Sequence, residues 1–192
     1  MGPPVRQPGG TARHPTRRRL RHTHLDRTHT GGVVLTEQFT AHTTHRFDHP
    51  VADVYRAFVD PAMLALWFGP LGFHVPAGTV EVDPRVGGAW NLTMVSNDDP
   101  EWQSPVTSTL QEIEENRIIV GTSTAHGIPG IEDGTPLSLT LEFTEDGDGT
   151  IVTLTQGPFP EGMRDVNVAG WAQSFRKLEA LLEAPKEFFQ IP

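Results

Sequence analysis

The sequence Asp83-Pro84-Arg85-Val86-Gly87-Gly88-Ala89-Trp90 joins a turn to the beginning of a strand. Adjacent glycines permit a tight turn that residues with a Cβ rarely adopt. A second glycine and tryptophan, Gly170-Trp171, lie in an amphipathic segment near the C-terminus, and this pattern puts both on the inner face of a helix. The two elements together predict a helix facing an antiparallel sheet, an arrangement that can leave an apolar cavity for a small molecule.

Polar and apolar residues alternate in short segments on both sides of this turn, as in strands with one buried face. The alternation predicts strands at 39–48, 80–82, 90–94, 110–113, 118–120, 137–143 and 151–155. Gly147-Asp148-Gly149 predicts the hairpin between the last two. The Gly- and Pro-rich segment 125–135 predicts a loop at the mouth of the cavity.

Three segments have helical spacing instead. Short helices are expected from about Pro50 and at 63–68, and a long helix follows Pro160. On the long helix, Lys177 is expected on the solvent-facing side. Gly170 costs a helix about 1 kcal/mol relative to alanine, so we expect close approach to the sheet, or room for a ligand, at that point. The order predicts an α+β helix-grip fold, in which a curved antiparallel sheet wraps around a long C-terminal helix and two short helices follow the first strand.

Charge divides the chain into two parts. Residues 1–32 contain seven arginines and one aspartate, whereas the whole chain has a net charge of −9. We predict a disordered basic tail at 1–33 and one domain at 34–192. The acidic domain disfavours nucleic acid and anionic membranes as partners. The absence of cysteine excludes thiol chemistry and agrees with a cytoplasmic location.

The sequence resembles the START-like (SRPBCC) superfamily and, within it, the family named after the activator of the Hsp90 ATPase (AHSA-type). The resemblance covers about 40–183. It rests on the segments 50–58, 60–61, 83–90, 149–150 and 170–171, and on Trp67 with Gly69-Pro70. It implies the helix-grip fold and a pocket for a hydrophobic ligand, but no particular reaction.

The expected cavity wall consists of large apolar side chains, which a plain core would equally use: Trp67, Phe68, Trp90, Met94, Trp102, Phe143, Trp171 and Phe175. Asn167 and Ser174 share a helix face with Trp171, and their polar groups are expected to orient a ligand. The favoured function is therefore non-covalent binding of a small hydrophobic or aromatic molecule.

Two other functions stay open. An enzyme resembling polyketide cyclases or hydrolases could use the same cavity, with His74 or His126 as a general base. A chaperone-interaction module is the second alternative. We expect no cofactor and no metal, since His42 and His45 point to opposite faces of a strand. A homodimer is left open.

Overall fold

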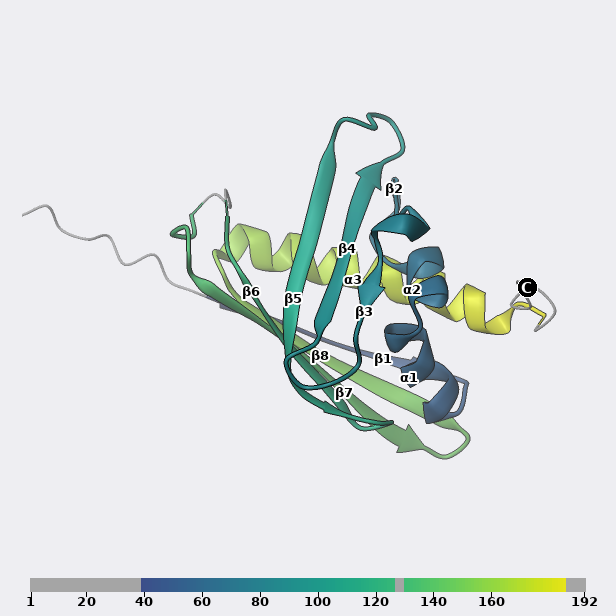
Figure 1. Cartoon of the computed structure of the whole chain (residues 1–192). Helices are drawn as coiled ribbons and strands as arrows, with labels where there is room; N and C mark the ends of the chain where they lie inside the picture. Colours follow the sequence, from purple (N-terminus) through teal and green to yellow (C-terminus); the bar gives the residue numbers. More distant parts are fainter. Residues whose placement is uncertain (1–38, 127–129, 186–192) are drawn as a thin grey trace, which may run out of the picture. The chain divides into compact units, whose positions relative to one another are not determined.

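The computed structural model describes residues 39–126 and 130–185 of the 192-residue chain (Figure 1). These described residues all belong to one unit of the chain. The predicted tail at 1–33 lies outside the described residues. No helix within the described ranges is long and apolar enough to cross a membrane.

The described chain begins with β1 (Phe39–Phe47), followed by α1 (Val51–Val59) and α2 (Pro61–Trp67). Asp60 separates the two helices, and its side chain accepts hydrogen bonds from the backbone N–H groups of Ala62 and Met63. Proline in the first turn of α2 suits a helix start because its missing N–H would have no partner there. The two short helices expected after the first strand are confirmed.

The remaining strands form one antiparallel sheet. They are β2 (Phe73–His74), β3 (Glu81–Val82), β4 (Ala89–Ser96), β5 (Gln103–Glu114), β6 (Ile118–Thr124), β7 (Pro136–Asp146) and β8 (Gly149–Phe159), with a short 3-10 helix η1 (Ala77–Thr79) before β3. The strand order is β1-β8-β7-β6-β5-β4-β2, and β3 also pairs with β4. A long helix, α3 (Glu161–Glu183), packs on β1, β8, α1 and α2. The curled sheet with this helix confirms the helix-grip fold.

The Gly-Gly turn ties β4 to β5. Gly87 N–H donates to the carbonyl oxygen of Leu110 at 2.7 Å, and Leu110 N–H donates to Gly88 O at 2.9 Å. A Cβ on Gly88 would lie 2.0 Å from the carbonyl oxygen of Asp83, closer than any real contact. Gly87 adopts a φ of +80°, which favours glycine. The exposed Arg85 pairs with Asp83 at 2.8 Å on the outside of this turn.

The sheet divides between β5 and β6. Their pairing runs from Glu114 opposite Ile118 only as far as Thr109 opposite Thr122. Beyond this point β5 pairs with β4 alone, down to Gln103, and β6 pairs with β7 alone (Figure 1). A register shift between Leu110 and Glu112 accompanies the separation, and bulges of this kind bend a strand. The sequence predicted β5 to begin only at Leu110, so the diverging part of the strand was missed.

Candidate functional site

Three of the four predicted wall tryptophans are buried, and their indole N–H groups have partners within the protein. Trp67 Nε1 donates to Ala57 O and Trp90 Nε1 donates to Phe58 O, both at 2.9 Å. Trp171 Nε1 donates to the side-chain oxygen of Gln156 at 2.8 Å. These bonds connect α1 to α2 and to the sheet, and β8 to α3. The indoles can offer a ligand ring surface but no free donor.

Phe68 occupies the space that the sequence predicted to be empty. Its ring centroid lies 5.4 Å from that of Trp90 and 5.4 Å from that of Trp171, with edge-to-face geometry in both pairs. Phe143 and Phe175 are buried in the same cluster. The expected void directly between the two tryptophans is therefore wrong, because an aromatic ring from the end of α2 fills it.

A small cavity lies on the inner face of the sheet. It is lined by Trp90, Ser108, Leu110, Ile119, Gly121, Leu139 and Leu141, and its volume is about 10 Å³. This is room for about one water molecule. The part of the inner face that lines this cavity is thus mostly apolar, and the cavity itself holds little open space.

Asn167 lies on the inner side of α3, one turn before Trp171. Its Oδ1 atom is buried and has no hydrogen-bond partner among the described residues. The structure therefore gives this predicted orienting residue an unused acceptor. Ser174 differs, since its hydroxyl donates to the Gly170 carbonyl oxygen at 2.9 Å and is satisfied within the helix.

Gly170 does not approach the sheet closely. A Cβ built at this position meets no atom of the described residues within 4 Å. Close helix-to-sheet contact is therefore the wrong explanation for this glycine, and open space next to Asn167 is what the structure has instead.

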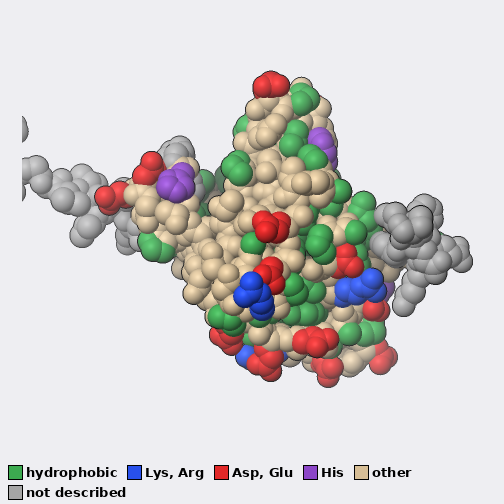
Figure 2. All heavy atoms as spheres, viewed as in Figure 1, with side chains coloured by type: hydrophobic (Ala, Val, Ile, Leu, Met, Phe, Trp, Pro, Cys, Tyr) green, Lys and Arg blue, Asp and Glu red, His purple; other side chains and the backbone are tan. Residues whose placement is uncertain are grey.

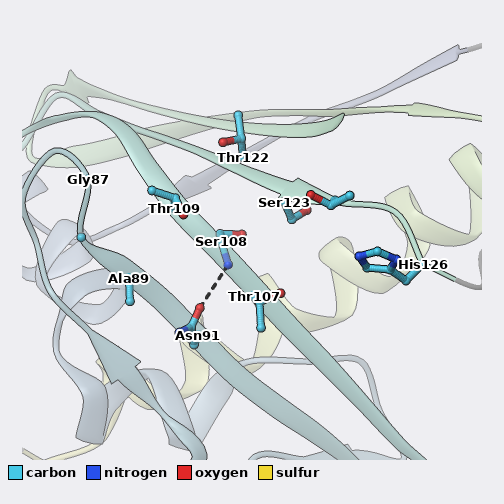
Figure 3. Close-up of a pocket in the computed structure, with 11 residues that line it drawn as sticks. Gly87, Ala89, Asn91, Thr107, Ser108, Thr109, Thr122, Ser123 and His126 are labelled. Carbon is cyan, nitrogen blue, oxygen red and sulfur yellow. Dashed lines mark hydrogen bonds between the residues drawn. The ribbon is translucent and has the colours of Figure 1, made fainter. Parts of the chain in front are cut away.

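A larger groove opens at the division between β5 and β6 (Figure 3), with a volume of about 390 Å³. Small hydroxyl side chains dominate its lining, which comprises Gly87, Gly88, Ala89, Asn91, Thr107, Ser108, Thr109, Thr122, Ser123, Thr124 and His126. Asn91 Oδ1 accepts from Ser108 N–H at 3.2 Å, as drawn in Figure 3. Sequence reasoning missed this groove, apart from His126. Its signal is the run of serine and threonine at 107–109 and 122–124.

The remaining predicted residues lie elsewhere. Trp102 is 62% exposed at the β4–β5 connection, where its ring packs on Phe73, so it is not part of an inner wall. Met94 is half-buried and its sulfur packs near Gly69. His74 is exposed and contacts Asn97 at 2.7 Å, whereas His126 is exposed in the groove. The two histidines are thus not brought together with the buried aromatic cluster.

Lys177 is partly buried rather than solvated, contrary to the helical pattern. Its ammonium group donates to the carbonyl oxygens of Phe68, Gly69 and Phe73 at 3.3, 3.1 and 3.5 Å. Burial lowers the pKa of Lys177 from its ordinary value. The side chain joins α3 to the segment that positions Phe68. This contact could not be read from the amphipathic pattern.

The curled sheet, the two short helices after β1 and the inner-face cavity define a helix-grip protein of the START-like class. The sequence model of the Activator of Hsp90 ATPase homolog 1-like family matches residues 48–183, and the chain belongs to this family. This match confirms the family resemblance seen in the sequence. Proteins with this fold typically have a hydrophobic cavity, and the fold specifies no ligand.

Solved structures of bacterial proteins have the same fold. Protein CV1439 from Chromobacterium violaceum is 27% identical, with a TM-score of 0.66 over 76% of this chain and 98% of its own. The AHSA1 (SPO3351) protein from Silicibacter pomeroyi is 22% identical, with a TM-score of 0.64 over 75% and 97%. CalU16 from Micromonospora echinospora is 20% identical, with a TM-score of 0.52 over 80% and 89%. No curated protein matches the chain.

Proposed function

We propose that this protein binds, without covalent chemistry, a small aromatic or apolar molecule that carries a hydrogen-bond donor. The bound molecule lies against the inner face of the sheet beside the first half of α3. The observation that carries the proposal is the buried Oδ1 of Asn167, for which the described part of the chain supplies no hydrogen-bond donor.

A buried acceptor without a donor costs a folded protein about 1–3 kcal/mol, so its presence needs a reason. A ligand N–H or O–H that reaches this oxygen supplies one. The open space over Gly170 supports the same location, because residues three apart on a helix are neighbours on its surface. The adjacent Trp171 ring offers an apolar contact surface for the rest of the molecule.

The inner cavity of about 10 Å³ is smaller than any such ligand, so binding requires side chains or strands to move apart. The flank formed by the β4–β5 hairpin can move most readily, since half of β5 has no partner on its β6 side. Its inward residues Met94 and Val106 are only half-buried. Modest displacement of this hairpin enlarges an apolar space without breaking the β1-β8-β7 part of the sheet.

N-phenyl-1-naphthylamine is a suitable probe because it is apolar and aromatic and has one N–H donor. The test titrates the full-length protein with it and follows probe emission and tryptophan quenching. We expect saturable binding that Asn167→Leu weakens by about tenfold, the equivalent of one hydrogen bond of about 1.4 kcal/mol. Ala169→Leu is the matched control, because Ala169 is exposed on the same helix and should leave affinity unchanged.

A second probe separates the hydrogen bond from shape. 1-Phenylnaphthalene has nearly the same rings but no donor, so Asn167→Leu should not weaken its binding. Absence of saturable binding of the first probe to the wild type would refute the proposed function. Equal losses for both probes would refute the role of Asn167 as the acceptor.

A further inference from the structure

Where β5 and β6 diverge, few atoms lie between the outer groove and the inner cavity. Ser108 lines both spaces, and Gly121 lines the inner one. A Cβ placed on Gly121 would lie 3.5 Å from the Cβ of Ser108. Only the Ser108 hydroxymethyl group and Gly121 therefore separate the two spaces at this point. Residues as small as these, on neighbouring strands, permit the close approach of another molecule.

The strands at the division are built to remain apart. Pro105 lies in the part of β5 that diverges from β6, and it has no N–H with which to continue a ladder. The Ser108 N–H donates to the Asn91 side chain of β4 at 3.2 Å, which ties this part of β5 to β4. On the other side, β6 keeps its pairing with β7 through Thr124 opposite Pro136. The opening is therefore a stable feature of the sheet.

The chemistry of the groove is polar but almost uncharged. Among its described lining residues, His126 is the only one that can ionise. In Figure 2 the sides of the β4–β5 hairpin carry few charged side chains, apart from an acidic one at its tip; acidic side chains also lie beside the histidine at the left, and most other charges lie toward the lower end of the sheet. Hydroxyls can donate to and accept from a ligand, whereas the described lining residues offer a carboxylate or an ammonium group no carboxylate, lysine or arginine as a counter-charge.

We propose that the β5–β6 division is the entrance to the interior and that its groove holds the polar, uncharged end of the bound molecule. The ligand class is then amphipathic: an apolar or aromatic part that passes Ser108 and Gly121 toward Trp90, and a hydroxyl- or carbonyl-bearing end among the threonines. This inference rests on the proposed function, which it extends by an entry route and a head-group chemistry. The groove volume of about 390 Å³ lies within the range of small-molecule sites.

The chain has no cysteine, so a disulfide can be placed between positions 108 and 121 without competing thiols. The 3.5 Å separation of the two Cβ positions lies at the lower end of the range that disulfides span. In the double variant Ser108→Cys/Gly121→Cys, oxidation should fasten β5 to β6. The association rate of N-phenyl-1-naphthylamine, measured by stopped flow, should fall at least tenfold on oxidation and recover on reduction.

The control is Thr140→Cys/Thr155→Cys, which joins opposite residues of β7 and β8 away from the groove. Its oxidation should leave the association rate unchanged. If the wild type binds the probe but oxidation at 108 and 121 does not slow binding, the entrance is refuted while the proposed function stands. If the wild type binds no probe, the proposed function fails and the entrance with it.

A second variant keeps the entrance testable if the disulfide form does not fold. Ser108→Cys alone should react with a soluble disulfide reagent, and saturating N-phenyl-1-naphthylamine should slow this reaction at least fivefold. Thr144→Cys, at an exposed position of β7 outside the groove lining, should react at the same rate with and without the probe. If Ser108→Cys reacted at the same rate with and without the probe, the proposed entrance would be refuted.

The preference of the groove for an uncharged polar group is tested by comparing an alcohol with a carboxylate. Decanol and decanoate have alkyl chains of the same length class and differ in their polar end. The concentration at which each displaces half of the bound N-phenyl-1-naphthylamine measures its affinity. Thr107→Lys introduces a cation into the groove and should improve decanoate relative to decanol at least threefold, whereas Thr144→Lys, at an exposed position of β7 outside the groove lining, should not. An unchanged ratio in Thr107→Lys would show that the polar end lies elsewhere.

Discussion

Asn167→Leu is expected to make the unliganded protein more stable while it weakens binding. The buried Oδ1 of Asn167 has no partner among the described residues, and such an atom costs about 1–3 kcal/mol. Leucine removes the acceptor at similar volume and adds a few tenths of a kcal/mol of helix propensity. We therefore expect a gain of about 1–2 kcal/mol in the free energy of unfolding. At about 2–4 °C per kcal/mol for a domain of this size, Tm should rise by about 2–8 °C.

The assay is urea unfolding followed by far-ultraviolet circular dichroism, with thermal scans in parallel. Asn91→Leu is the matched control, since the Asn91 amide donates to Glu81 at 3.0 Å and accepts from Ser108 N–H. That variant should lose about 1 kcal/mol. If Asn167→Leu were instead destabilised by about 1 kcal/mol or more, the oxygen would already be satisfied, and the reasoning would be refuted.

Phe68→Ala should cost about 3–5 kcal/mol in urea unfolding, because the ring fills the space between Trp90 and Trp171; a loss below about 1 kcal/mol would mean that the two indoles close up without it. Gly170→Ala should raise the unfolding free energy by about 0.5–1 kcal/mol, since the new methyl meets no atom, and a destabilised variant would reveal a close neighbour. Lys177→Met should reveal a pH dependence. Burial lowers the pKa of Lys177 in the folded state, so between this lowered pKa and the ordinary value of 10.5 the unfolded chain binds more protons, and wild-type stability rises with pH relative to the variant. A wild-type advantage that shrinks over this range would contradict the burial of the lysine.

Most strands and helices could be predicted from the sequence, because alternation, helical spacing and turn residues all lie within the segment that they describe. Alternation at 137–143 and 151–155 predicts half-buried strands, and those strands are present as parts of β7 and β8. The Gly87-Gly88 pair predicts a tight turn, which the required absence of a Cβ at Gly88 explains. The amphipathic pattern of α3 likewise predicts the burial of Phe175 and Leu178, although Val166, which the same pattern places on the inner side, is 71% exposed.

Only the tertiary structure decided how these elements meet. The position of Phe68 between two indoles depends on how α2 packs, which no spacing along the chain encodes. Lys177 reaches three carbonyl oxygens more than 100 residues away in sequence, so its burial depends on the path of the 68–73 segment. The diverging part of β5 was missed because its inward residues include Ser104 and Ser108, so apolar alternation is lost. The groove exists because pairing stops at Thr109 and Thr122, and register and sheet curvature are properties of the folded sheet as a whole.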